Sequence, residues 1–269
     1  GGGGLRFGQL GFFADGTLGS RTAAMLAPFE GEPANVGVVV CGGEELKQLV
    51  SQAAASAIAV AIHAIGDRGV REALDAIEHA RRNDAGRLRH RIEHAQLVDP
   101  ADIQRFARLG VVASMQPAHG AVDRENALKY WGSRVAHASP YRSLADAGAV
   151  LAFGSDAPFG LDLSDTSFSV LAGVHAAVTR RWVALDGRVA EPPQDYAPGQ
   201  VLRLDEALAA YTVGPAFVGG EERWRGSLTV GHCADMVVLE ENLYKVPVGD
   251  IPHVPVVATI VDGRVVYRR

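Results

Sequence analysis

The stretch Ala57-Ile-Ala-Val-Ala-Ile-His63-Ala-Ile-Gly-Asp67 decides the fold class. A short apolar run ends at a histidine, a Gly-Asp turn follows, and residues 70–82 then carry apolar side chains at helical spacing. The same order recurs along the chain, which is typical of βα units and a parallel sheet. The other predicted strands are Leu10–Ala14, Arg89–His94, Val111–Gln116 and Val150–Ser155, and the other predicted helices are Ala101–Leu109 and Tyr141–Ala147.

The pattern changes after about residue 225. Residues 226–239 and 255–267 alternate apolar and polar side chains in short runs, and Asp262-Gly263 has the composition of a two-residue hairpin turn. We therefore predict antiparallel β-structure in residues 226–269, separate from the α/β part in residues 5–225. Residues 1–4 are all glycine, a poor start for a folded element, and are interpreted as a linker or the edge of a segment.

Composition excludes several classes of function. With 269 residues, of which 48% are hydrophobic and 21% charged, the chain is large enough to bury a full core. A net charge of −5 without basic clusters argues against nucleic acid as a partner, and no apolar run reaches the ~18 residues of a membrane span. Cys41 and Cys233 stand in no disulfide-type or metal-binding spacing, so we expect a cytoplasmic protein. A small molecule is the expected substrate, and a homo-oligomer is left open.

Polar side chains end three of the predicted strands. His63 and His94 close two of them, and Asp156 follows a third in a Gly-Ser-Asp-Ala-Pro turn. Because the C-terminal ends of parallel strands meet at one edge, we expect these three side chains to converge within reach of one metal ion. A lone histidine at such a place is more often a hydrogen-bonded core residue, but the repetition on successive strands favours ligands. Two imidazoles and a carboxylate suit Zn²⁺ or another divalent ion.

Four further residues give weaker signals. His119 follows the fourth predicted strand and is a candidate for contacting substrate or stabilising an oxyanion. Asp15 either orients a ligand or caps a turn. Arg21 is a candidate clamp for a substrate carboxylate, with a solvated role as the simpler alternative. Glu93 directly precedes His94 on its strand, so side-chain alternation predicts that it points away from the site.

Five motifs occur in order along the chain. They are Phe12-Phe-Ala-Asp-Gly-Thr-Leu-Gly-Ser-Arg-Thr-Ala-Ala24, His63-Ala-Ile-Gly-Asp67, Arg89-His-Arg-Ile-Glu-His-Ala-Gln96, Ser114-Met-Gln-Pro-Ala-His119 and Gly154-Ser-Asp-Ala-Pro158. Together they resemble the YtcJ-like branch of the amidohydrolase superfamily, which is similar to the N-substituted formamide deformylases and related to the D-aminoacylases.

The resemblance implies an α/β fold. The chain is expected to supply strands four to eight of a TIM-type (β/α)8 barrel, followed by the C-terminal part of a small β-sandwich. The resemblance also implies that His63 and His94 are the ligands from strands five and six. Asp156 is implied to be both the strand-eight ligand and the general base.

Two departures from the family pattern bear on the site. Where the family carries a lysine on strand four, often carboxylated, this chain has Gly11. Either the site is reduced here, or the glycine stands in the sequence for a chemically modified lysine. The second alternative is favoured because glycine inside an apolar strand is otherwise unfavourable. The family's His-x-His motif does not occur in the sequence, so the first half of the barrel is expected to lie outside it.

The leading hypothesis is hydrolysis of a non-peptide C–N bond in an amide, formamide or cyclic amide, by water activated on one or two divalent ions. A first alternative is a catalytically incomplete fragment, or a structural partner that needs a separate N-terminal half. A second is a deaminase-, esterase- or phosphotriesterase-type activity, because the fold does not fix the leaving group.

Overall fold

The computed structural model describes residues 8–84, 87–159, 169–183, 189–190 and 196–269. The interpretation of residues 1–4 as a linker falls outside this range. The strands are β1 (Gln9–Phe13), β2 (Ala59–Ala64), β3 (Arg91–His94), β4 (Val112–Met115), β5 (Leu151–Phe153), β6 (Trp182–Val183), β7 (Val189–Ala190), β8 (Met236–Leu239), β9 (Val256–Val261) and β10 (Arg264–Arg268). The α-helices are α1 (Gly43–Ala55), α2 (Asp67–Asp84), α3 (Pro100–Leu109), α4 (Gly120–Tyr130), α5 (Tyr141–Asp146), α6 (Val170–Thr179), α7 (Leu204–Tyr211) and α8 (Val213–Gly219). Short 3₁₀ helices are η1 (Pro117–His119), η2 (Gly132–His137), η4 (Pro198–Gln200) and η5 (Val248–His253).

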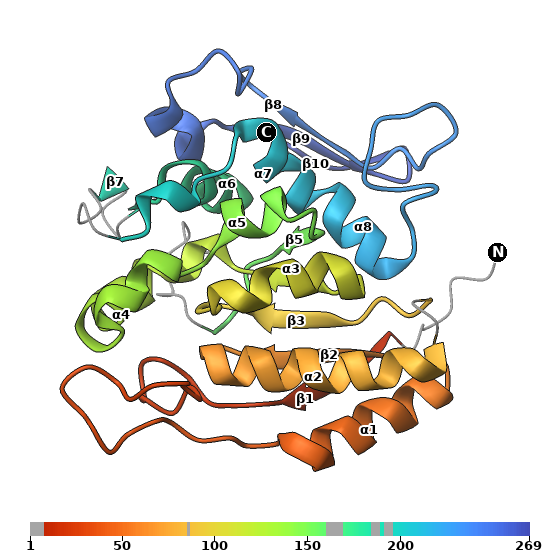
Figure 1. Cartoon of the computed structure of the whole chain (residues 1–269). Helices are drawn as coiled ribbons and strands as arrows, with labels where there is room; N and C mark the ends of the chain where they lie inside the picture. Colours follow the sequence, from red (N-terminus) through yellow and green to blue (C-terminus); the bar gives the residue numbers. More distant parts are fainter. Residues whose placement is uncertain (1–7, 85–86, 160–168, 184–188, 191–195) are drawn as a thin grey trace.

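The first five strands form one parallel sheet in the order β1-β2-β3-β4-β5 (Figure 1). Each strand hydrogen-bonds to the next one along the chain, and at least one helix follows each strand. This is the arrangement of consecutive units in a (β/α)8 barrel, so the predicted α/β fold is confirmed. The register aligns Phe13, His63, Glu93 and Ser114 at one level across four strands.

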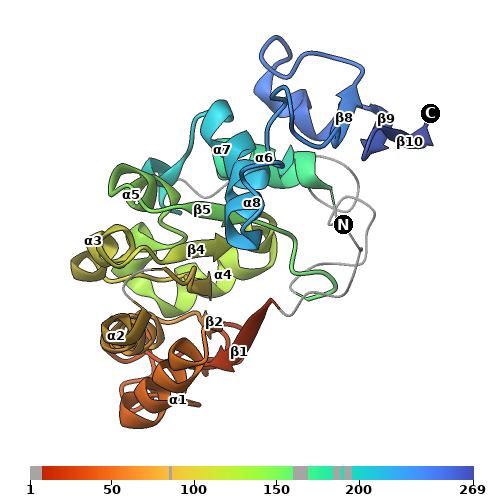
Figure 2. The same ribbon diagram turned by 90° about the vertical axis from the view of Figure 1, so that its right-hand side faces the viewer.

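The two faces of this sheet differ in chemistry. The helices α1, α2 and α3 cover one face of the sheet (Figure 2). Val60, Ile62 and Ile92 are fully buried in the apolar core that they share with these helices. The alternate residues of the same strands, such as His63 and Arg91, line a cavity on the other face. Period-two alternation in these strands thus separates an apolar layer beneath the helices from a cavity face that carries His63, Arg91 and Glu93.

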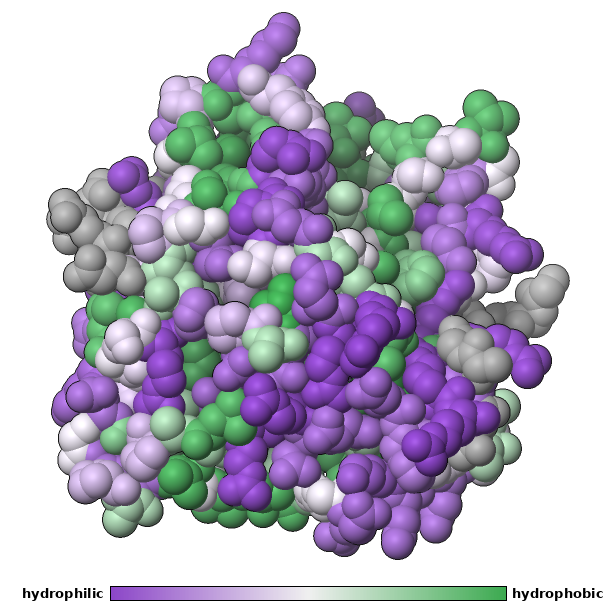
Figure 3. All heavy atoms as spheres, viewed as in Figure 1, coloured by the Kyte–Doolittle hydropathy of each residue, from purple (hydrophilic) through white to green (hydrophobic). Residues whose placement is uncertain are grey.

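The outer helices are amphipathic, as their spacing predicts. In α2 the fully buried side chains Val70, Leu74 and Ile77 repeat at helical intervals and pack on the sheet. In α3 the Asp99 side chain caps the first turn by accepting a hydrogen bond from the Ala101 amide, and Pro100 occupies the first helical position. The outward faces of the two helices carry charged residues, including the Arg105 ion pairs with α2, and this surface is largely hydrophilic (Figure 3).

The C-terminal strands β8, β9 and β10 form a separate antiparallel sheet in the order β10-β9-β8. This agrees with the change of pattern seen in the sequence. The segment is anchored to the barrel part by Leu243, Ile251 and Val254, which belong to the main apolar core. A second sheet that would complete a β-sandwich stays a prediction. In the part of the chain that the structure describes, no helix combines the length and the apolar composition needed to cross a membrane.

Candidate metal centre

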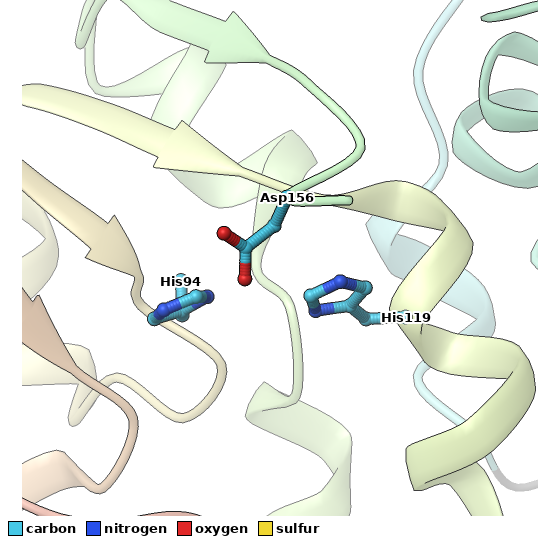
Figure 4. A group of neighbouring side chains, drawn as sticks. All are labelled: His94, His119 and Asp156. Carbon is cyan, nitrogen blue, oxygen red and sulfur yellow. The ribbon is translucent and has the colours of Figure 1, made fainter. Parts of the chain in front are cut away.

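His94, His119 and Asp156 converge at the C-terminal edge of the parallel sheet (Figure 4). Each offers one ligand atom, and these atoms lie within 4.8 Å of one another. His94 ends β3, His119 ends η1 just after β4, and Asp156 lies in the turn after β5. Three neighbouring strand ends therefore deliver two imidazoles and a carboxylate to one place, which is a donor set suited to a divalent ion.

The backbone is strained at two of these residues. His94 has φ 72° and Asp156 has φ 56°, both in the left-handed region that non-glycine residues rarely adopt. The left-handed turn at His94 ends β3 and redirects the chain. Strain of this kind gathers at functional sites, where the surrounding structure holds a side chain in a required place.

The imidazole of His94 is held neutral and oriented. Its Nδ1 lies 2.9 Å from the Gln116 Oε1, and because an amide oxygen only accepts, Nδ1 donates and Nε2 keeps the lone pair. Burial lowers the pKa of His94 to about 3, with a further contribution from His63. His94 is therefore uncharged at neutral pH, which is the form that binds a metal ion.

We predict that Gln116→Leu weakens binding of a divalent ion about 10- to 100-fold, the range for residues that orient a histidine ligand. Leucine removes the acceptor that fixes the ring, whereas Gln116→Glu keeps an oxygen in place and should bind close to wild type. The measurement is a Zn²⁺ titration with a competing chelator. Gln104→Leu, at an exposed position of α3, is the matched control. Equal affinities for Gln116→Leu and the control would contradict the orienting role.

His63 lies beside this group and is not one of its three members. Its ring centroid is 4.6 Å from that of His94, and its Nε2 donates to the Gly16 carbonyl oxygen at 2.9 Å, which leaves the lone pair on Nδ1. His63 also lines the cavity. Its role as a ligand therefore stays a prediction, with its place next to His94 in its favour.

Asp15 connects the loop that follows β1 to the turn that follows β2. The carboxylate accepts hydrogen bonds from the backbone amides of Ala24, Ile65 and Gly66, and the side chain is fully buried. Burial raises the pKa of Asp15 to about 6, against the lowering effect of these hydrogen bonds. Such burial does not fit a direct substrate contact. The geometry instead corresponds to the alternative of a structural and orienting role.

Position 11 has room for a larger side chain. Gly11 lines the cavity, and a Cβ atom added there would meet nothing within 4 Å. Gly66 in the His63 motif is different, because a Cβ there would lie 2.0 Å from the Ala24 carbonyl oxygen. The backbone therefore requires glycine at position 66 and leaves position 11 open to the lysine of the family pattern.

The cavity has a volume of about 800 Å³, within the usual range for small-molecule sites. Glu93 lines it and pairs with Arg91, so the prediction that Glu93 points away is wrong. The alternation argument fails because the left-handed turn at His94 brings that residue to the cavity as well. Arg21 is not among the lining residues and instead forms an ion pair of 2.7 Å with Glu32.

Gln116, Gln96 and Asp123 are among the lining residues to which the sequence analysis assigns no role. Gln116 follows β4 at the same kind of strand end as the histidines, so the signal for it was present. Gln96 lies two residues after His94 and gave a weaker signal. Asp123 lies on α4, and no sequence pattern indicates a role for it, because its approach to the cavity depends on how that helix packs.

Comparisons with known proteins give a consistent result. A family model described as the amidohydrolase family matches residues 1–267. The protein YtcJ of Bacillus subtilis is 31% identical over 98% of this chain and 48% of its own length. The N-substituted formamide deformylase of Arthrobacter pascens is 29% identical over 98% of this chain and 46% of its own.

A solved structure described as an uncharacterized metal-dependent hydrolase from Pyrococcus horikoshii is 31% identical to the chain, with a TM-score of 0.74. The match covers 90% of this chain and 46% of that structure. The chain thus spans about half the length of the relatives it matches.

Proposed function

Because the chain belongs to the amidohydrolase family, we propose that it contributes half of the active site of a metal-dependent hydrolase that cleaves a non-peptide C–N bond. The observation that carries the proposal is the convergence of His94, His119 and Asp156 within 4.8 Å. The similarity to an N-substituted formamide deformylase and to a metal-dependent hydrolase supports the reaction class and the need for an ion. Amide, formamide and cyclic amide substrates all fit this proposal.

The donor set fits a resident divalent ion. His94 and His119 both carry a lone pair on the nitrogen that makes no hydrogen bond to the protein, because the other nitrogen donates to Gln116 and to the Ser155 carbonyl respectively. Asp156 adds a carboxylate. His63, whose ring lies next to that of His94, is the proposed ligand of a second ion. Nitrogen and carboxylate donors favour Zn²⁺, which we propose as the native metal. When bound, such an ion supplies Lewis-acid activation of water and of a carbonyl oxygen.

Asp156 is proposed as the general base. Partial burial raises the pKa of Asp156, against the lowering effects of His119 and His63, and a carboxylate with a raised pKa accepts a proton more readily. The proton taken from the attacking water would then pass to the departing nitrogen as the C–N bond breaks. The alternative role of His119, hydrogen bonding to a developing oxyanion, would need its Nδ1 to carry a proton and not to bind the ion, because Nε2 already donates to the Ser155 carbonyl.

We further propose a cytoplasmic location, and two alternative functions use the same residues. Cys41 and Cys233 are both free, which supports a reducing cytoplasm. A deaminase or an esterase would use the same groups on a different leaving atom. A structural fragment without activity of its own would need a separate N-terminal half to complete the site.

The test uses the intact protein that contains this chain, freed of metal by a chelator and assayed on a panel of formamides, cyclic amides, esters and aminopurines. We expect turnover of amides to be lost with the metal and restored by Zn²⁺ more fully than by Mg²⁺. Turnover of amides by metal-free protein would overturn the proposal, and so would turnover of the esters or aminopurines alone. The isolated 269-residue chain, assayed in parallel, tests the fragment alternative.

A further inference from the structure

Gln96 and Asp123 line the same cavity beside the proposed metal centre. Gln96 follows β3 and is 8% exposed, and Asp123 lies in the first turn of α4. The Gln96 Nε2 donates to the Asp123 Oδ2 at 2.6 Å. The Gln96 backbone is also fixed, because its carbonyl accepts from the Ser139 amide at 2.6 Å. Both side chains are thus held in place at the cavity wall.

The orientation of the Gln96 amide follows from its neighbour. A carboxylate only accepts hydrogen bonds, so the amide must turn its NH₂ group toward Asp123. The Oε1 atom is then left buried, and it has no hydrogen-bond partner in the part of the chain that the structure describes. A buried acceptor without a donor is unfavourable, and it calls for a partner from outside the protein.

The Asp123 carboxylate also has few hydrogen-bond partners. Among the described residues, Gln96 is the only one that makes a hydrogen bond to its carboxylate. Burial raises the pKa of Asp123, with Gln96 and His119 lowering it. Of the other two acidic groups of the cavity wall, Glu93 forms an ion pair with Arg91, and Asp156 belongs to the proposed metal centre. Outside the proposed metal centre, the cavity therefore holds a carboxylate without an ion pair among the described residues, next to an unsatisfied amide oxygen.

We propose that Gln96 and Asp123 form a subsite for a protonated amino group of the substrate. An ammonium group has three donors and a positive charge, so it satisfies the Gln96 Oε1 and the Asp123 carboxylate together. The inference rests on the proposed function and narrows its substrate class to amides that carry a second, cationic nitrogen.

The spacing limits the length of this substrate. His119 and Asp123 are one helical turn apart, and residues at that separation lie about 5–6 Å apart. His119 in turn belongs to the three-residue group around the proposed ion. The amino group and the scissile amide are therefore separated by a short aliphatic spacer.

The test compares N-(3-aminopropyl)formamide with its neutral analogue N-butylformamide, which has nearly the same shape. Binding is measured by calorimetry on the intact protein with a chelator present, so that neither compound is turned over. We expect the aminopropyl compound to bind about 10- to 100-fold more tightly, the range for hydrogen bonds to a charged group. Asp123→Asn, which keeps the size and removes the charge, should abolish the difference, and Gln96→Met should reduce it.

Glu125→Gln is the matched control, because it removes one negative charge from the same helix at an 87% exposed side chain. It should bind both compounds as wild type does, and thermal unfolding checks that all three variants fold. Equal binding of the two compounds, a preference that survives Asp123→Asn, or no binding of either compound would overturn the subsite. Restoring Zn²⁺ then tests the proposed function separately, since discrimination without turnover supports the subsite and contradicts the hydrolase.

Discussion

Replacing Asp156 with asparagine is expected to lower kcat at least about 100-fold in the intact protein, with a much smaller change in substrate binding. The physical reason is the loss of a general base, which typically costs 10²- to 10⁴-fold in rate. Asparagine keeps the size and one side-chain oxygen, while His94 and His119 still offer their nitrogens to the ion. The variant should therefore retain most of its metal. The measurement is kcat together with metal content for the same preparation.

The matched control for this prediction is Asp146→Asn, since the Asp146 side chain is 65% exposed on α5 and pairs only with Arg142 among the described residues. It should have wild-type kcat and metal content. An Asp156→Asn protein that turns over at near the wild-type rate would leave the mechanism without its base. A variant that loses its metal in step with its activity would show that Asp156 acts mainly as a ligand.

The sequence predicted the parallel sheet well because its signals are local. Each strand is a short apolar run followed by a polar residue, and all five predicted runs overlap the strands β1 to β5. The helices α2, α3 and α5 likewise contain nearly all the residues predicted for them. Burial of alternate residues in strands, and of one stripe in helices, leaves a period in the sequence that can be recognised without tertiary contacts.

The details of the site were less accessible from the sequence. The positions of His94 and Asp156 at strand ends predict a role for both, and the structure places them together with His119. What could not be predicted is that His94 adopts a left-handed backbone, which breaks the alternation and brings His94 to the same cavity as Glu93. The side-chain hydrogen bonds of Gln116 and Gln96 also depend on which residues meet across the sheet, and no local pattern encodes that.

Replacing His94 with alanine is expected to weaken divalent-ion binding at least about 100-fold, beyond the 10- to 100-fold range for residues that only orient a ligand. His94 lies next to both candidate second ligands. It belongs to the group with His119 and Asp156, and it also contacts His63. Its loss therefore removes a nitrogen donor whichever second imidazole completes the set. The metal content of the purified protein and a Zn²⁺ titration with a competing chelator provide the measurement.

His79→Ala is the control for His94→Ala, since His79 is exposed on α2 and should leave ion binding unchanged. His119→Ala and His63→Ala in the same titration identify the second imidazole ligand. The variant that lacks this ligand should lose Zn²⁺ affinity nearly as strongly as His94→Ala does. A large excess of Zn²⁺ should return part of the activity to His94→Ala, since the remaining donors still bind weakly. A His94→Ala protein that keeps wild-type metal content would remove His94 from the centre and, with it, the basis for placing the ion at this edge of the sheet.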